Sequence, residues 1–396
     1  MAERTLYLDH AATTPTDQAV VEAMLPYFGE CFGNPSSIYR LGRAALQALD
    51  DARSITAEVL HCSPKELIFT GGGSESDNLA IKGAAFAARA AGKGNHIITS
   101  AIEHHAVLHA CDYLKEFGFE VTVLPVNRDG LVSPDDLRAA IRPSTVLATI
   151  MYANNEIGTI QPIAELGAIC REHGVVFHTD AVQGGGSLPL DVNELNVDLL
   201  TLTAHKFYGP KGVGALYVRR GVQLLPQING GGQERRRRAG TENVPGIVGF
   251  ATALQRAEQQ RLSYVAHCTA LRDRLIDGIH ERIPHVQLNG HRTQRLANNA
   301  NMSFAYTEGE SILLLLDQAG ICASSGSACA SGSLEPSHVL MALGMDADQA
   351  HGSVRFSVGK NTTIEDIDYV LDVLPAMIER LRSVSLLWRE QLVAGT

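Results

Sequence analysis

Short apolar runs alternate with helix-length stretches over residues 66–219. The runs are continuously hydrophobic rather than alternating, which is typical of strands buried on both faces. They fall at Glu66–Thr70, His96–Ser100, Glu120–Val126, Thr145–Met151, Val175–Ala181, Leu199–Ala204 and Gly214–Arg219. Helical patterns such as Ser74–Ala91 and Ile163–His173 separate several of them. The pattern predicts an α/β fold around one seven-stranded, mainly parallel sheet, with a locally antiparallel edge where a Gly-rich turn joins the last two runs.

The pattern changes after residue 219. A Gly- and Arg-rich loop at 229–243 precedes a long helical pattern at 246–280. Shorter elements follow, with expected strands at 286–289, 300–304 and 354–358 and an expected terminal helix at 363–382. We therefore expect a large domain over 16–260 and a smaller α+β domain made of 1–15 and 261–396.

Composition narrows the function classes. Lys and Arg number 33 against 43 Asp and Glu, a formal net charge of −10, which argues against a nucleic-acid or anionic-membrane binder. No apolar run reaches the ~18 residues of a spanning helix, and the first residues do not resemble a signal peptide, so we expect a cytoplasmic protein. The seven cysteines are scattered without a C-x-x-C pair, so neither a disulfide framework nor a structural metal site is expected, and most should be small buried side chains.

Two candidate chemical groups follow successive strands on the side where open α/β sheets bind ligands. Lys206 is a candidate Schiff-base nucleophile, although a solvated loop lysine is the commoner role. Asp180 could hold a protonated pyridine nitrogen, although Asp also caps the start of helices well. Each residue makes the functional role of the other more plausible. Together they favour pyridoxal-type chemistry.

Two further segments could serve the same cofactor. Phe69–Asp77 contains a Gly-rich turn before a helix, where free N–H groups could bind a phosphate, and Ser74 with Asp77 resembles a capping box. The segment lacks the lysine of a P-loop, and Gly turns before helices are common. His104 follows the second run and could stack on an aromatic cofactor and shuttle protons, although a lone histidine is usually structural.

A segment almost without bulky side chains spans 321–336 and contains Cys329. A cysteine there would be accessible, as a reactive thiol requires, but a flexible connector with an incidental cysteine has the same composition. Arg355 lies among apolar neighbours and should pair with a carboxylate in bidentate fashion, either from a ligand or in a structural salt bridge. The basic run Arg235–Arg238 could bind an anion or simply be solvated.

These segments together resemble the cysteine desulfurases, a family of class V, fold type I pyridoxal phosphate enzymes. The resemblance extends over nearly the whole chain, and its pieces match in order. They are Tyr7–Pro15, Phe32–Ser37, Ala153–Gly158, His178–Gln183, Ala204–Lys206 and Ser324–Cys329. The short cysteine segment, with 334–338 after it and 233–243 before it, is similar to the nitrogen-fixation and housekeeping iron–sulfur types rather than to the selenocysteine-preferring branch.

The resemblance implies a role for each matching residue. Lys206 would bind pyridoxal 5′-phosphate covalently and move protons, His104 would stack on the ring and exchange protons with sulfur, and Cys329 would be the nucleophile. The remaining positions would hold the cofactor or the substrate. The phosphate would be surrounded by Gly73, Ser74, Thr203, His205 and, from a second subunit, Thr241. The ring would be contacted by Asp180 and Gln183. Asn155 would contact both cofactor and substrate, and Arg355 would bind the substrate carboxylate.

The implied reaction converts L-cysteine to L-alanine and leaves the sulfur as a persulfide on Cys329. An iron–sulfur scaffold protein is the expected acceptor, the active form would be a homodimer, and no metal, nucleic acid or membrane is expected to bind. The closest rivals are other fold type I enzymes, such as an aminotransferase or a selenocysteine lyase. A catalytically silent partner of an iron–sulfur assembly factor is a different class, against which Lys206 argues. The glycine run 184–186 exceeds the family pattern.

Overall fold

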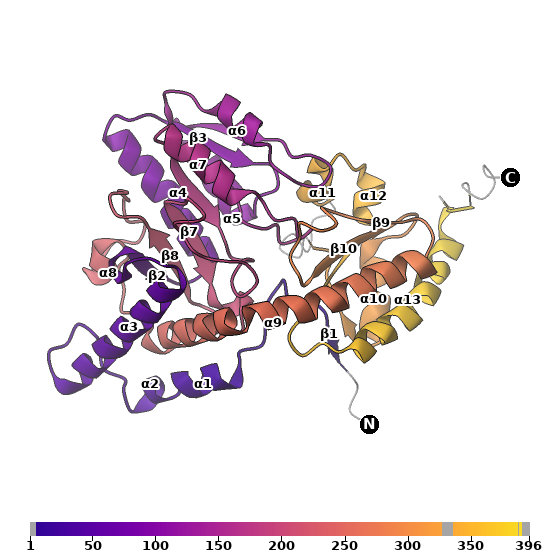
Figure 1. Ribbon diagram of the computed structural model, residues 1–396, viewed down its shortest axis with the longest axis horizontal. Helices are drawn as coiled ribbons and strands as arrows, with labels where there is room; N and C mark the ends of the chain where they lie inside the picture. Colours follow the sequence, from indigo (N-terminus) through magenta and orange to yellow (C-terminus); the bar gives the residue numbers. More distant parts are fainter. Residues whose placement is uncertain (1–4, 327–335, 387, 390–396) are drawn as a thin grey trace.

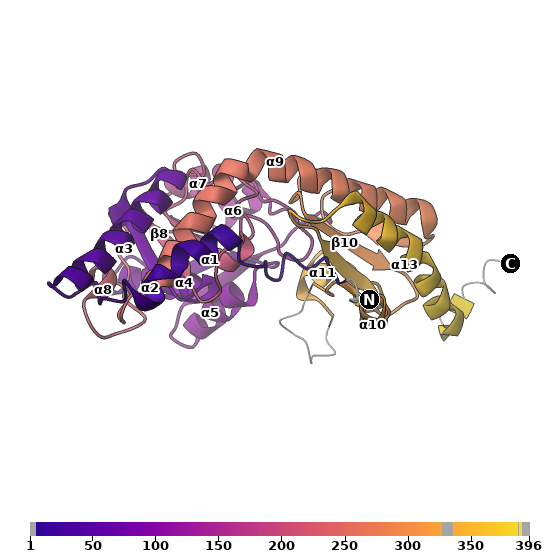
Figure 2. The same cartoon turned by 90° about the horizontal axis from the view of Figure 1, so that it is seen from below.

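The computed structural model describes residues 5–326, 336–386, 388 and 389. A large α/β part and a smaller α+β part lie end to end, and the long helix α9 (Val244–Arg282) runs along both (Figures 1 and 2). Its start is fixed by Asn243, whose side chain accepts a hydrogen bond from the Gly246 amide, and by Pro245 in the first turn. The helix predicted at 246–280 is confirmed.

The large part contains the predicted seven-stranded sheet. Its order is β2 (Leu67–Thr70), β8 (Gly214–Val218), β7 (Leu199–Thr203), β6 (Val176–Asp180), β5 (Thr145–Thr149), β3 (His96–Ser100) and β4 (Glu120–Leu124). Only β8 runs antiparallel to its neighbours, β2 and β7. The antiparallel pair is therefore confirmed, but its place at the edge is wrong. All of β8 is buried and pairs on both sides, and its distant partner β2 forms the edge.

Helices cover both faces of this sheet. Successive side chains of a strand point to opposite faces, so Leu67 and Phe69 belong to one core and Ile68 to the other. The first core includes side chains of α3 (Arg40–Val59), α6 (Pro134–Ala140), α7 (Ile163–Glu172) and α9, and the second is closed by α4 (Gly73–Ala90) and α5 (His105–Lys115). The shorter helices of this part are α1 (Gln18–Met24), α2 (Pro26–Gly29) and α8 (Gln233–Arg236), with 3₁₀ turns at Pro64–Glu66 and Ala204–Lys206.

The smaller part has its own sheets. The antiparallel sheet has the order β12 (Ser353–Ser357), β10 (Asn299–Phe304) and β9 (Val286–Leu288), and a parallel pair joins β1 (Leu6–Tyr7) to β11 (Ile321–Cys322). The helices are α10 (Gly309–Gln318), α11 (His338–Ala342), α12 (Ala347–His351) and α13 (Ile364–Val384). The return of the N-terminus to this part is confirmed by the β1–β11 pair.

The hydrophobic cores support a division of the chain into two domains. One core contains Leu6 and Leu8 together with residues from Cys268 to Ile378, whereas the cores of the large sheet take residues from Val20 to Leu254. We propose a large domain over 16–260 and a small domain over 1–15 and 261–396.

Among the residues described, no helix is both long and apolar enough to cross a membrane.

The capping box expected at Ser74 is not formed. Helix α4 begins one residue earlier, at Gly73, and its N-cap Gly72 makes no side-chain cap bond. Asp77 points into the protein rather than back to the helix start, since it is buried on the apolar stripe shared with Ala80 and Ile81. The first turn of α4 therefore leaves its backbone N–H groups without a side-chain cap.

Candidate active site

A short N-terminal segment, residues 9–14, brings several predicted site residues together. Nζ of Lys206 donates to the carbonyl oxygens of Ala11 and Ala12 at 2.5 and 2.7 Å. Nε2 of Gln183 donates to the same Ala11 oxygen at 3.0 Å. Sequence reasoning did not foresee this role of segment 9–14, although a run of small and polar residues directly after a short strand was a usable signal.

Asp180 and Lys206 extend from neighbouring parallel strands. Asp180 ends β6, which pairs with β7, and Lys206 lies in the 3₁₀ turn that follows β7. Burial raises the pKa of the Asp180 carboxyl to about 6, while the charge of Lys206 acts in the opposite direction. Oδ1 of Asp180 also accepts from the Val182 amide at 2.9 Å, so the capping role and an electrostatic role coexist. A buried carboxylate near a lysine suits the recognition of a protonated ring nitrogen.

His104 begins helix α5, where it serves as the N-cap. Its Nδ1 accepts a hydrogen bond from the Ala106 amide at 3.1 Å, so in the neutral ring the proton resides on Nε2. Burial, and then the charge of Lys206, lower the pKa of His104 to about 4. The imidazole is therefore neutral near pH 7. It shares a small cavity with Asn155, Glu156 and Gly326.

Arg355 lies on β12 and is almost completely buried. Nη2 is 2.7 Å from Oδ1 of Asp9, and Nη1 donates to the Asn155 and Gly326 carbonyls at 2.8 and 3.4 Å. The structural salt bridge that the sequence left open is thus present, with Asp9 as the partner, and bidentate pairing with the carboxylate of a ligand stays a prediction. Among the described residues, no group accepts from the buried Nε of Arg355. An unfilled buried donor is costly and suits the carboxylate of a ligand.

A glycine cradle lies at the first turn of α4. Gly72 has a φ of 154°, and a Cβ placed on Gly73 would come within 2.9 Å of Val182 Cγ2 and 3.7 Å of Thr203 Cβ. Side chains are thus excluded where the helix start meets the ends of β6 and β7. This arrangement, with Lys206 nearby and Asp180 at a neighbouring strand end, fits a phosphorylated pyridine ring.

The other residues predicted to bind the phosphate differ in burial and in hydrogen bonding. Nδ1 of His205 lies 3.1 Å from Oγ1 of Thr13, and burial followed by Lys206 lowers the pKa of His205 to about 4. Oγ1 of buried Thr203 donates to the Val213 carbonyl at 3.2 Å. Ser74 is exposed at the first turn of α4, and Thr241 is exposed in the loop before α9. No described contact joins Thr241 to the other site residues within one chain.

Arginines of the basic run 235–238 form hydrogen bonds and ion pairs with the rest of the protein, so the run is not solvated throughout. Glu234, just before it, is buried and pairs with Arg53 through both carboxylate oxygens at 2.7 and 3.0 Å. Arg235 donates to backbone carbonyls, and Arg238 pairs with Glu75 at 2.9 Å. Oε2 of Glu75 in turn accepts from the Gly71 amide at 2.8 Å, which ties this loop to the glycine cradle.

A layer of buried polar groups lies behind Asp180, and sequence reasoning missed it. His178 contacts the hydroxyls of Thr149 and Thr201 at 2.8 and 3.0 Å, and its Nε2 is 3.7 Å from Oδ1 of Asp77. Burial lowers the pKa of His178 to about 3, whereas burial and then Asp180 raise the pKa of Asp77. The signal was an aspartate on the apolar stripe of a predicted helix. His178 in this layer is therefore neutral near pH 7.

Glu103 gives a stability prediction. Its Oε1 accepts from Ser100 Oγ and the Met151 amide at 2.6 and 2.9 Å, and burial raises its pKa to about 8. A raised carboxyl pKa means that stability is lost as pH rises from ~4.5 to ~8. Glu103→Gln keeps the acceptor but cannot ionise. The free energy of unfolding of the variant should equal that of the wild type near pH 5. At pH 8 it should be higher than that of the wild type by about 2–4 kcal/mol.

Denaturant unfolding of the holoenzyme at both pH values measures this difference. The exposed Glu165→Gln on α7 is the matched control and should change stability at neither pH. A gain for Glu103→Gln that is the same at pH 5 and pH 8 would contradict the proposed ionisation.

Cys329 lies outside the described residues, together with the rest of 327–335. The described flanks of this segment reach the site. Ser324 forms backbone hydrogen bonds with Arg355 at 2.6 and 3.2 Å. On the other side, Ser337 Oγ donates to Oε2 of Glu156 at 2.6 Å, and Glu156 also borders Gly326. Both ends of the segment that carries Cys329 therefore lie beside the cavity of His104 and Asn155.

Known proteins resemble the chain over nearly its full length. A cysteine desulfurase IscS of Methanosarcina thermophila is 57% identical over 382 residues, covering 96% of this chain and 94% of that protein. The cysteine desulfurase IscS of Dictyoglomus turgidum is 55% identical over 383 residues, covering 97% of each.

Solved structures share the fold. A NifS-like protein matches with a TM-score of 0.90 and 37% identity, covering 96% of this chain and all of the other. SspA in complex with cysteine matches with a TM-score of 0.79 and 39% identity, covering 91% and 100%. The model of the aminotransferase class-V family matches residues 6–370. The chain therefore belongs to the aminotransferase class-V family.

Proposed function

We propose that this protein is a pyridoxal phosphate-dependent cysteine desulfurase. It takes the sulfur of L-cysteine, releases L-alanine and retains the sulfur as a persulfide on Cys329 for iron–sulfur cluster assembly. The observation that carries the proposal is the convergence of Lys206, Asp180 and Arg355 on one site that both flanks of the Cys329 segment reach. The names of the full-length relatives support the same activity.

The cofactor would be held by residues at the strand ends. When bound, pyridoxal phosphate withdraws electrons from the α carbon of an amino acid. Lys206 would bind its aldehyde, Asp180 would face the ring nitrogen, and Gln183 the phenolic oxygen. The phosphate contacts would come from the helix start and the end of β7, namely Gly73, Ser74, Thr203 and His205.

The substrate would be oriented by its carboxylate. Nε of Arg355 is the buried donor without a described acceptor, and the neighbouring Asn155 borders the same cavity. His104 is neutral near pH 7 and carries its proton on Nε2, so it can donate a hydrogen bond to a thiolate or stack on a ring. Lys206, once released from the cofactor, would move protons at the substrate carbon.

Sulfur transfer would use the Cys329 thiolate. The thiolate attacks the sulfur of bound cysteine, an S–S bond forms as the Cβ–S bond breaks, and the carbon skeleton leaves as alanine after protonation. A thiol that must serve both a buried substrate and an external acceptor belongs on a segment that begins and ends at the site mouth. The described flanks at Ser324 and Ser337 satisfy this requirement.

Assembly, acceptor and compartment are part of the same proposal. A homodimer would bring the partner's Thr241 to the phosphate, since Thr241 is exposed and no contact among the described residues joins it to the site. Several large apolar side chains are exposed on the neighbouring N-terminal helices and loops, as an interface requires: Leu25, Phe28, Phe32, Ile38 and Tyr39.

The acceptor would be a scaffold protein of iron–sulfur assembly, general or for nitrogen fixation, in the cytoplasm.

Product analysis tests the activity. The purified holoenzyme with L-cysteine and a reductant should release sulfide and alanine in equal amounts. Transfer of the amino group to a 2-oxo acid without sulfide would indicate an aminotransferase. Activity on L-selenocysteine with none on L-cysteine would indicate a selenocysteine lyase. A protein that binds no pyridoxal phosphate at all would leave only a binding role.

A further inference from the structure

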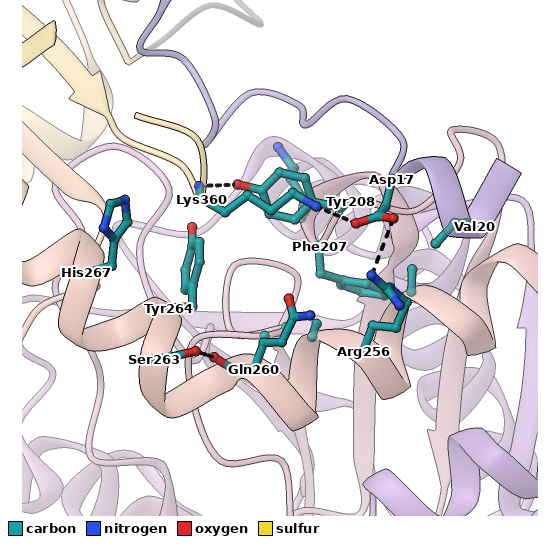
Figure 3. Close-up of a pocket in the computed structure, with 15 residues that line it drawn as sticks. Asp17, Val20, Phe207, Tyr208, Arg256, Gln260, Ser263, Tyr264, His267 and Lys360 are labelled. Carbon is teal, nitrogen blue, oxygen red and sulfur yellow. Dashed lines mark hydrogen bonds and ion pairs between the residues drawn. The ribbon is translucent and has the colours of Figure 1, made fainter. Parts of the chain in front are cut away.

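A second cavity is lined by Lys206, Phe207 and Tyr208 and lies against helix α9 (Figure 3). It measures about 240 Å³. Its walls are largely apolar, from Val20 and Phe207 to Ala253, Ala257 and Tyr264, and its floor includes Gly185 and Gly186. A Cβ on Gly186 would lie 2.9 Å from that of Ala257, so the glycine run 184–186, unexplained by the reaction, permits this close approach.

Charged groups gather at one end of the cavity. Lys360 forms an ion pair with Oδ2 of Asp17 and lies 4.4 Å from the centre of the Tyr208 ring. Oδ1 of Asp17 accepts from the Ala19 amide at 2.9 Å. The nearest approach of Arg256 to this carboxylate is 3.7 Å, which is too long for a hydrogen bond. Arg256 and Asp17 therefore form a long ion pair without a hydrogen bond, while the hydrogen bonds of Asp17 go to other groups.

Arg256 is left with unused hydrogen-bonding capacity. Within the described part of the chain, its buried Nε has no hydrogen-bond partner. Figure 3 shows its side chain reaching from α9 toward Asp17, beside Gln260 on the next turn of the helix. A guanidinium in this state is a docking group for a planar anion, since carboxylates engage it through two parallel hydrogen bonds.

The charge balance points to one anionic group. Arg256 and Lys360 outnumber Asp17 by one positive charge, even when Lys206 is committed to the cofactor. The proximity of the Asp17 carboxylate disfavours a doubly charged phosphate. The cavity is smaller than the ~300–1,000 Å³ common for drug-sized ligands, which leaves room for a compact apolar body and not for a nucleotide.

We propose that this cavity binds a small amphipathic carboxylate. The carboxylate pairs with Arg256, and an aromatic or branched apolar body packs against Phe207, Tyr264 and Ala257. Because Lys206 is itself one of the lining residues, an occupant would lie beside the lysine of the reaction site. The inference goes beyond the proposed function and does not depend on it, since binding is measurable without cysteine turnover.

Calorimetric titration of the holoenzyme with 1-naphthylacetate tests the site, with the uncharged 1-naphthylacetamide as the matched ligand. The acid should bind at least about tenfold more tightly than the amide, and Arg256→Gln should weaken acid binding by about tenfold or more. Ala257→Phe, which fills the cavity, should abolish binding of both. Arg261→Gln is the control variant, because Arg261 is on the same helix but pairs with Glu258.

The outcomes separate the proposal from its alternatives. Acid binding that survives both Arg256→Gln and Ala257→Phe overturns it, as does the absence of measurable binding to the wild type. Binding that is lost in Arg355→Gln and kept in Arg256→Gln places the acid in the reaction site and also overturns it. The retained cofactor absorption of each variant verifies that α9 and the Lys206 loop are intact.

Discussion

The Cys329→Ala variant should bind pyridoxal phosphate with wild-type absorbance and form alanine from cysteine at less than about a thousandth of the wild-type rate. In the proposed mechanism Arg355 and Asn155 would hold the substrate, and the substitution does not touch them. The thiolate that must accept the sulfur is absent, so no S–S bond can form. Spectroscopy with L-cysteine and an alanine assay measure both halves of this expectation.

Cys322→Ala is the matched control for this variant. Cys322 lies seven residues before Cys329, and burial together with Asp317 and Asp9 raises its thiol pKa, which makes it a poor nucleophile. Its replacement should leave the rate within about twofold of the wild type, as expected for a thiol outside the reaction. A Cys329→Ala enzyme that forms alanine at the wild-type rate would contradict the proposed sulfur transfer.

Replacing Lys206 with alanine should have the second large effect. The variant loses both the covalent attachment of the cofactor and the amine that moves protons, so we expect desulfuration to fall by at least about a thousandfold. It also removes a positive charge that helps lower the pKa values of His104 and His205. Those two pKa values should rise, although burial keeps them below the ordinary range.

The measurements for Lys206→Ala are the absorption spectrum, the rate and histidine titration by NMR. Lys211→Ala is the control for the spectrum and the rate, because Lys211 is an exposed lysine in the same loop. It should change neither the spectrum nor the rate. A Lys206→Ala enzyme that still binds the cofactor covalently would show that another amine serves as the attachment point.

Local sequence patterns predicted the large sheet well. The apolar runs marked all seven strands, because strands covered by helices on both faces are made mostly of apolar side chains. The pairing of β2 with β8 was not visible, since it joins residues 67–70 to residues 214–217 far along the chain. The Gly-rich turn indicates only the local pairing of β7 with β8. For this reason β8 was wrongly predicted to lie at the edge of the sheet.

The site was predictable where chemistry follows a strand end. Asp180 and Lys206 were found because each follows an apolar run, and parallel strands place such positions side by side. The contacts of segment 9–14 were not predictable, because a carbonyl oxygen that accepts from Lys206 leaves no trace in residue type. A salt bridge of Arg355 was foreseen as one alternative, but neither Asp9 as its partner nor the backbone carbonyls at Nη1 could be predicted from residue types.

The sequence did not predict the polar layer behind Asp180, and the reason is different. Asp77 was interpreted as part of a helix cap because it stands three residues after Ser74, and local spacing cannot reveal that the helix starts one residue earlier. Its burial beside His178 depends on how α4 packs on the sheet. Only the position of Asp77 on the apolar stripe hinted at this environment.

The most direct test of the central claim is a single-turnover reaction without reductant. Holoenzyme is mixed with one equivalent of L-cysteine, alanine is measured, and the mass of the peptide that contains Cys329 is determined. We expect one alanine per cysteine consumed and one added sulfur atom on that peptide, removable by a thiol. Alanine without added sulfur on Cys329, or sulfur carried by another cysteine, would contradict it.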